Sequence, residues 1–191
     1  MVKVAILHEG KSDKSLDNKI LKLLLNNLGF NENQVEFFGF GNKSNFYKLD
    51  NIKYSRLKLQ IDEELISKVL FVVDADYEAN DKTYGGHENT LSELNNIRQS
   101  LDMEDISDIY VTCDPVTKDG YLESLILSSI PQTQKECIET FLKCSEFKSK
   151  ENHKAILNQI YNSAYPDAPY DFSHQNFNDL KQKLKNLFEE Q

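Results

Sequence analysis

Two apolar segments of this chain end abruptly in acidic residues. Residues 4–7 are followed by Glu9, and residues 70–73 by Asp74 and Asp76. A buried strand gains nothing from ending in clustered carboxylates unless a positive charge compensates them, and carboxylate oxygens suit a hard divalent cation. If the two segments are strands of one parallel sheet, their carboxyl ends lie at the edge where open α/β folds place ligands. We therefore expect Glu9, Asp74 and Asp76 to converge on one site for such a cation.

The hydrophobic spacing predicts the α/β core that would position these acids. The expected strands are rich in β-branched and aromatic residues and cover residues 2–7, 34–40, 69–73 and 106–113. Helical spacing begins near Leu16 and near Asn89, whereas residues 41–45 are expected to form a loop and residues 63–68 a short helix. This order predicts a mainly parallel sheet flanked by helices.

The pattern becomes helical after Gly120. From there the apolar residues recur at helical spacing in four successive groups, the third of which contains Ile156 and Ile160. We therefore expect an α/β core over residues 1–115 and a helical C-terminal extension over residues 116–191 that packs on it.

Composition narrows the classes of function. The chain has 191 residues, a net charge of −9 and no apolar run of the roughly 20 residues that span a bilayer. It begins with an expected strand rather than a signal sequence, so we expect a cytoplasmic protein with no membrane contact. The three cysteines lack metal-ligand spacing and are expected to be reduced and partly buried. The negative charge disfavours a general polyanion-binding surface unless bound metal ions reverse its sign locally.

Two short motifs carry a resemblance to a known family. The segment Glu9-Gly10-Lys11-Ser12-Asp13 resembles the Glu-Gly-x-Ser/Thr-Asp opening of Toprim domains, and Asp74-Ala75-Asp76 resembles their Asp-x-Asp motif. Toprim domains occur in topoisomerases, bacterial primases, ribosomal-RNA maturation nucleases and overcoming-lysogenization-defect (OLD) nucleases. The chain length, the segment 120–123 and the helical tail are similar to a stand-alone, OLD-like Toprim group. The resemblance implies a Toprim-like, Rossmann-like fold over the first 115 residues.

The resemblance also implies roles for individual acids. Glu9 would coordinate metal or act as a general acid or base, and Asp74 and Asp76 would hold Mg²⁺. Asp13 would help to hold a second ion, and Glu123 is the candidate for a further downstream glutamate of this branch. Two ions roughly 3.5–4 Å apart would suit in-line phosphodiester hydrolysis.

Three other residues are candidates for contacts with a phosphate group. Gly10 and Lys11 belong to the opening motif, and Lys118 lies shortly before Glu123. Lys11 is also a candidate catalytic residue beside Glu9.

The resulting hypothesis is a Mg²⁺-dependent, Toprim-type nuclease that acts on DNA or RNA. The alternative is a non-catalytic Toprim-like module of a defence or DNA-repair assembly, with a protein partner such as an ATPase, because the chain itself has no Gly-x-x-x-x-Gly-Lys-Ser/Thr motif. A metal-dependent nucleotide-sugar transferase also uses a strand-end Asp-x-Asp motif, but it gives the opening motif no role. A topoisomerase would need a tyrosine in a further domain, for which the chain has no room.

Simpler explanations exist for each of these acids. Strand-end carboxylates can be solvated or can cap a following helix. Asp13 suits a helix cap as well as it suits a metal ligand, and the two roles are compatible. Glu123 fits the first turn of a helix, where a carboxylate is favourable without any ligand.

Overall fold

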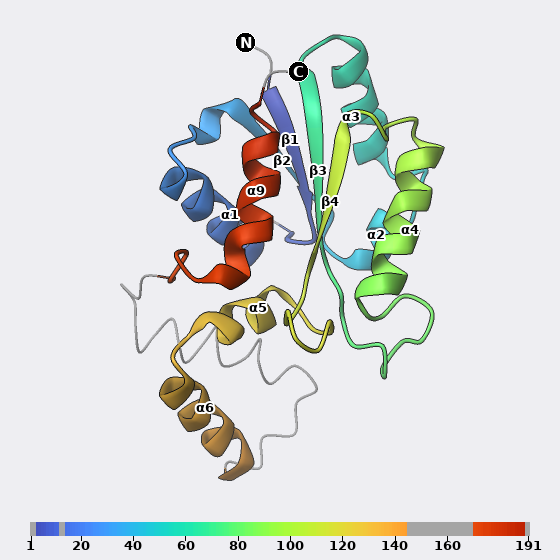
Figure 1. The fold of residues 1–191 in the computed structure, drawn as a ribbon. Helices are drawn as coiled ribbons and strands as arrows, with labels where there is room; N and C mark the ends of the chain where they lie inside the picture. The colour runs from blue at the N-terminus through green and yellow to red at the C-terminus, as the bar shows by residue number, and fades with distance from the viewer. Residues whose placement is uncertain (1–2, 12–13, 145–169, 190–191) are drawn as a thin grey trace.

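A four-stranded, all-parallel sheet forms the centre of the molecule (Figure 1). The computed structural model describes residues 3–11, 14–144 and 170–189. The strands lie in the order β2-β1-β3-β4 and cover Val35–Gly39, Lys3–His8, Ile66–Asp74 and Ser107–Thr112, respectively. The connection from β1 leads to β2 on one side, whereas β3 and β4 follow on the other. The point at which the strand order reverses therefore lies between β1 and β3, where such sheets leave a crevice for ligands.

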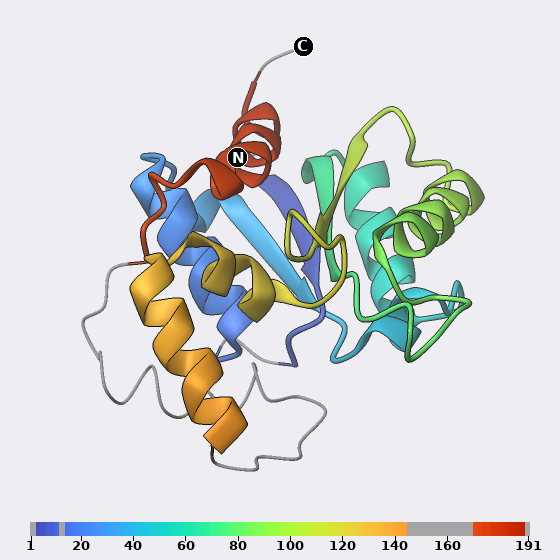
Figure 2. The same cartoon turned by 60° about the horizontal axis from the view of Figure 1, so that its bottom comes forward.

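Helices cover both faces of this sheet (Figures 1 and 2). One face carries α1 (Leu16–Asn27), α5 (Leu122–Ser129) and α9 (Asn178–Asn186), and α6 (Gln132–Cys144) continues beyond α5. The other face carries α2 (Lys43–Phe46), α3 (Ile52–Asp62) and α4 (His87–Ser100). Single 3₁₀ turns, Glu32–Gln34 and Gln175–Phe177, precede β2 and α9.

The alternation of side chains along the strands divides the core into two clusters. Val4 and Ile6 of β1 pack with α1, α5 and α9, whereas Ala5 and Leu7 pack with α3 and α4. Successive residues of a strand point to opposite faces, so continuously apolar strands are suited to a sheet that is covered on both sides. The predicted α/β fold, with a parallel sheet, flanking helices and a helical C-terminal part, is confirmed.

Two local predictions were wrong. The segment 41–45 contains the start of α2, because the Asn42 side chain accepts a hydrogen bond from the N–H of Asn45 and so caps a helix there. The segment 63–68 is not a helix, because α3 ends at Asp62 and β3 already begins at Ile66, whose side chain is buried in the core.

The cysteines only partly follow the expectation. Cys113 is buried, whereas Cys137 and Cys144 are exposed on α6. All three thiols are free. The helical group predicted around Ile156 and Ile160 lies outside the described residues. Among the helices that are described, none has both the length and the apolar character needed to cross a membrane.

Candidate functional site

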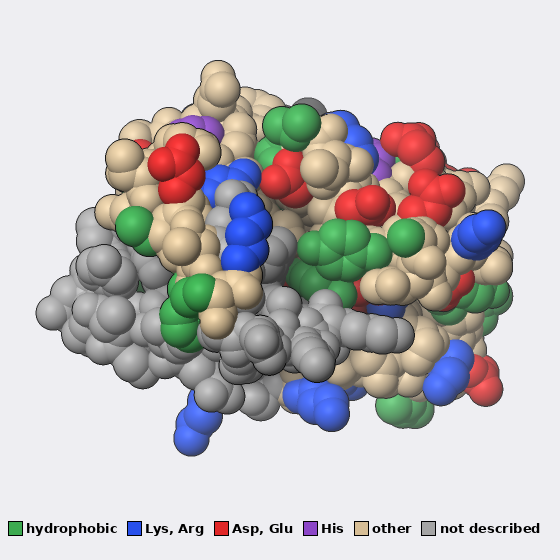
Figure 3. All heavy atoms as spheres, turned by 90° about the horizontal axis from the view of Figure 1, so that it is seen from below, with side chains coloured by type: hydrophobic (Ala, Val, Ile, Leu, Met, Phe, Trp, Pro, Cys, Tyr) green, Lys and Arg blue, Asp and Glu red, His purple; other side chains and the backbone are tan. Residues whose placement is uncertain are grey.

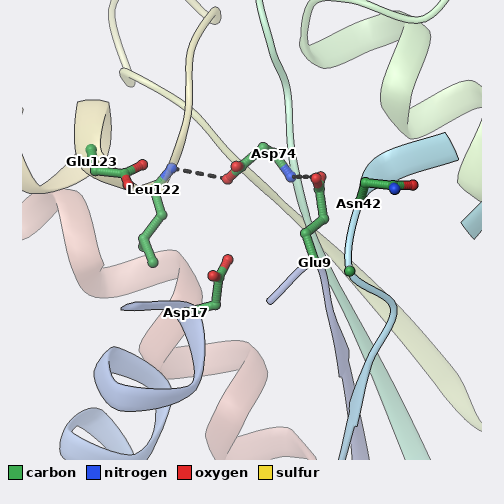
Figure 4. A pocket seen from close by; sticks show the side chains of 7 residues that line it. Glu9, Asp17, Asn42, Asp74, Leu122 and Glu123 are labelled. Atoms are coloured by element: carbon green, nitrogen blue, oxygen red, sulfur yellow. Dashed lines mark hydrogen bonds between the residues drawn. The ribbon is translucent and has the colours of Figure 1, made fainter. Parts of the chain in front are cut away.

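A cavity of about 190 Å³ lies at the carboxyl edge of the sheet, between the ends of β1 and β3. Its walls come from four parts of the chain: the β1–α1 region, the segment before α2, the end of β3 and the start of α5. The lining residues are Glu9, Asp17, Gly41, Asn42, Asp74, Leu122 and Glu123 (Figure 4). Four of these seven residues are acidic, and they come from three of these four parts of the chain.

Glu9 follows β1 directly and is joined to the end of β3. Its Oε1 atom accepts a hydrogen bond of 2.9 Å from the backbone N–H of Asp74. Burial raises the pKa of the Glu9 carboxyl well above its usual value, and the negative charges of Asp74 and Asp76 raise it further. The Asp74 N–H and the ammonium of Lys43 lower this pKa and so oppose the increase. Glu9 is therefore a carboxyl group whose environment favours its protonated form.

Asp74 ends β3 and connects it to the neighbouring strand and to α5. Its Oδ1 atom accepts hydrogen bonds from the hydroxyl of Thr112 and from the N–H of Leu122, the latter at 2.9 Å. Thr112 lies beside Asp74 in β4, and Leu122 is the first residue of α5. The partial positive charge of a helix N-terminus stabilises a carboxylate at this position. The side chain is only 6% exposed, so these contacts fix its orientation in the cavity wall.

Two further acids line the cavity from the first turns of helices. Glu123 belongs to α5 and is buried, and Asp17 belongs to α1, which is capped by Ser15. The side chain of Asp17 points from α1 toward Asp74 and Glu123 (Figure 4). The sequence analysis did not single out Asp17. The signal that could have found it is its position, since the helix that follows β1 must begin at the same edge as the strand-end acids.

Asp76 does not line the cavity, although it is close enough for its negative charge to raise the pKa of Glu9. Its Oδ2 atom is 3.3 Å from the Nζ of Lys43, with which it forms an ion pair. The backbone of Asp76 has a positive φ of 59°, and it exchanges two hydrogen bonds with Gly120. The chain therefore turns immediately after β3, so the two aspartates of the Asp-x-Asp motif have different neighbours.

Lys43 is the second residue that the sequence analysis missed. It is only 8% exposed and comes from α2, within the segment that was expected to be a loop. No local pattern marks it, because its partners lie 32 to 47 residues away in the sequence.

Gly10 supports the site rather than lining it. Its N–H donates a hydrogen bond of 3.1 Å to Nδ1 of the buried His8. A Cβ atom at Gly10 would lie 1.9 Å from the Oγ of Ser15, so only glycine allows the loop to lie against the start of α1. The position therefore depends on close backbone packing.

The two lysines predicted to contact phosphate lie at different places. Lys11 is exposed and its side chain lies next to Gly41, at the margin of the cavity. Lys118 is exposed and does not line the cavity. It lies in a turn in which its own N–H donates a hydrogen bond to the carbonyl oxygen of Asp114. Asp13 lies outside the described residues.

The residues that could hold a hard cation in the cavity are Glu9 and Asp74, because Asp76 does not line it. Within residues 3–11, 14–144 and 170–189, no three His, Cys, Asp or Glu side chains are arranged to hold a metal ion on their own. Glu9 and Asp74 nevertheless offer carboxylate oxygens to the cavity, with Asp17 and Glu123 facing them. Mg²⁺ typically takes one or two carboxylates and completes its shell with water or phosphate oxygens. Asp76 is directed to Lys43 instead.

The face around the cavity is not a basic surface. Figure 3 looks onto this end of the molecule, and the upper half of the view shows several acidic side chains with a few basic ones between them. A phosphate-rich ligand would meet repulsion there unless cations neutralised the acids.

Comparison with known proteins identifies no relative, since no family model, no curated protein and no solved structure matches this chain.

Proposed function

We propose that this chain is a Toprim-type, Mg²⁺-dependent enzyme that cleaves phosphodiester bonds in nucleic acid. The observation that carries the proposal is the convergence of Glu9, Asp17, Asp74 and Glu123 on one cavity at the reversal point of a parallel sheet. Ligands bind at this point in open α/β sheets. The resemblance of the two motifs to Toprim domains supplies the class of reaction, and the acidic cavity supports the requirement for a divalent cation.

Each residue would have a distinct task. Asp74, held by Thr112 and Leu122, would present a fixed carboxylate to the ion, which when bound polarises a phosphoryl oxygen. Glu9 would bind the same ion through its carboxylate, which the N–H of Asp74 orients. Lys11 at the cavity margin would contact a neighbouring phosphate.

The test is a cleavage assay on single- and double-stranded DNA and RNA with Mg²⁺ or Mn²⁺. Asp74→Asn keeps the shape of the side chain and its acceptor oxygen, but it removes the charge. We expect roughly a 100-fold or greater loss of cleavage. Asp50→Asn, at an exposed position between α2 and α3, is the matched control and should retain activity. Full activity of Asp74→Asn would refute the mechanism.

A second candidate is a non-catalytic Toprim-like module of a defence or DNA-repair assembly. The acid-rich face and the net charge of −9 favour it, because both oppose unaided binding of a polyanion. In this case the chain would work with a protein partner such as an ATPase, in the cytoplasm. Cleavage of nucleic acid by the purified chain alone would count against this candidate.

A further inference from the structure

Lys43 is a buried cation that is surrounded by oxygen atoms. Its Nζ donates hydrogen bonds of 2.7 Å to the carbonyl oxygen of Ala75 and to the Oγ1 of Thr90, and it lies 3.3 Å from the Oδ2 of Asp76. A buried ammonium group is tolerated only where charge and hydrogen bonds compensate its lost hydration. A carbonyl, a hydroxyl and a carboxylate provide both kinds of compensation here.

These three oxygens resemble part of the shell of a hard cation. Carbonyl and carboxylate oxygens are the ligands that such ions take from proteins. Two of the three belong to the Asp74-Ala75-Asp76 motif, so Lys43 is bound by the segment that the Toprim resemblance assigns to a metal. Asp74, by contrast, contacts N–H and hydroxyl donors.

We infer that Lys43 takes the place of a divalent ion at Asp76, so that the site binds a single ion, at Glu9 and Asp74, and Asp76 acts as a positioning residue. This inference rests on the proposed function only for the ion at Glu9 and Asp74. The arrangement of Lys43, Ala75, Thr90 and Asp76 is independent of it.

The elements around Lys43 hold it at this position. The side chain of Asn42 caps the start of its helix α2 by accepting a hydrogen bond from the N–H of Asn45, which fixes the backbone that carries Lys43. Thr90 lies in the first turn of α4 and is fully buried, with its hydroxyl 2.8 Å from the carbonyl oxygen of Gly86. The ammonium group is therefore a fixed charge. Unlike a second metal ion, it cannot activate water, so a mechanism in which a second ion binds at Asp76 is not available to this site.

The experiment measures how many ions the chain binds. Mn²⁺ is titrated calorimetrically into the wild-type chain and into Asp74→Asn, Asp76→Asn, Lys43→Met and the double variant Lys43→Met/Asp76→Asn. We expect one ion for the wild type, and an unchanged number for Asp76→Asn with a dissociation constant within about threefold. Asp74→Asn should lose this ion. Lys43→Met should gain one ion, and the double variant should lose that gain.

Each outcome decides the inference. Two ions in the wild type, or no additional ion in Lys43→Met, would overturn it, as would loss of the ion in Asp76→Asn. Circular dichroism checks the fold of each variant. Lys43→Gln, which removes the charge but keeps an N–H donor, replaces Lys43→Met if the latter fails to fold. If the wild type binds no ion but Lys43→Met binds one through Asp76, the replacement of an ion by Lys43 stands, whereas the ion at Glu9 and Asp74 and the proposed metal-dependent function fail.

Discussion

The two aspartates of the Asp-x-Asp motif lie two residues apart but belong to different environments. Asp74 lies in the cavity wall, where its partners are an N–H and a hydroxyl group. Asp76 lies outside the cavity and its partner is the ammonium of Lys43. The cavity therefore has several acids and no lysine among its lining residues. Outside the cavity, by contrast, Lys43 neutralises Asp76. The comparison teaches that two acids close in sequence need not face the same cavity.

Backbone geometry explains the division. In a regular strand the residues i and i+2 share a face. β3 ends at Asp74, and Asp76 has a positive φ of 59°, so the chain is no longer a regular strand at Asp76. The side chains of Asp74 and Asp76 therefore do not share a face. The hydrogen bonds between Asp76 and Gly120 then fix the turn.

The largest expected effect on folding separates the two acids directly. Asp74→Ala leaves the buried groups of Thr112 and Leu122 without their acceptor, and we expect the free energy of unfolding to fall by about 2–3 kcal/mol. Asp76→Ala removes the carboxylate partner of the buried Lys43 ammonium, which keeps only its two hydrogen bonds, so this variant should lose about 3 kcal/mol. Most of this loss should disappear when Lys43→Met is added, whereas Lys43→Met should not restore the stability of Asp74→Ala. Urea denaturation measures these values, and restoration of Asp74→Ala by Lys43→Met would contradict the division between the two environments.

A second prediction concerns Glu9 and pH. Its raised pKa means that the folded chain keeps a proton that the unfolded chain releases above about pH 4.3, so wild-type stability falls as the pH rises from there through the raised pKa. Glu9→Gln keeps an acceptor for the Asp74 N–H and has no such charge. The variant should therefore be more stable than the wild type at neutral pH, and this advantage should vanish in acid.

Urea midpoints between about pH 4 and pH 8 test this prediction. Glu104→Gln, at an exposed position, is the matched control and should show no such trend. An advantage of Glu9→Gln that is the same at every pH would show that the Glu9 charge is not the cause. Added Mg²⁺ should reduce the advantage, because an ion in the cavity would compensate the carboxylate.

The smallest effect is on the reactivity of Cys113, which follows Thr112 at the end of β4. Burial raises the pKa of its thiol to about 11, whereas Cys137 and Cys144 are exposed. Thiol labelling followed by mass spectrometry should therefore modify Cys113 at least roughly tenfold more slowly than the other two. Asp74→Ala should accelerate its labelling by loosening this edge, and Asp76→Ala should not. Equal acceleration by both variants would show that the edge does not divide as described.

The periodicity of the sequence predicted the sheet because each strand is buried on both faces and is therefore rich in apolar residues. The same logic placed Glu9 and Asp74 at one edge, and the structure brings both of them to the cavity together with Glu123. These residues end a strand, directly follow one or lie in the first turn of a helix, so local sequence determines where they lie.

Lys43, Asp17 and the turn at Asp76 depend on contacts that local sequence does not encode. Lys43 needs Thr90, which lies 47 residues away, and its helix of four residues is too short to show a periodic pattern. Asp76 leaves the cavity because of a backbone turn that is held by Gly120. Tertiary contacts, rather than local secondary-structure propensity, explain why these residues differ from the prediction.

The carbonyl oxygen of Ala75 also accepts a hydrogen bond of 2.9 Å from the N–H of Gly86. This hydrogen bond joins the two ends of the loop that runs from Ala75 to Gly86. Lengthening a loop whose ends are already joined adds little entropic cost, only about 0.6 kcal/mol for each doubling. Residues 79–82 are exposed at the far end of this loop. They are the place where a peptide tag or a fluorescent reporter could be inserted while the strand-end acids stay in position.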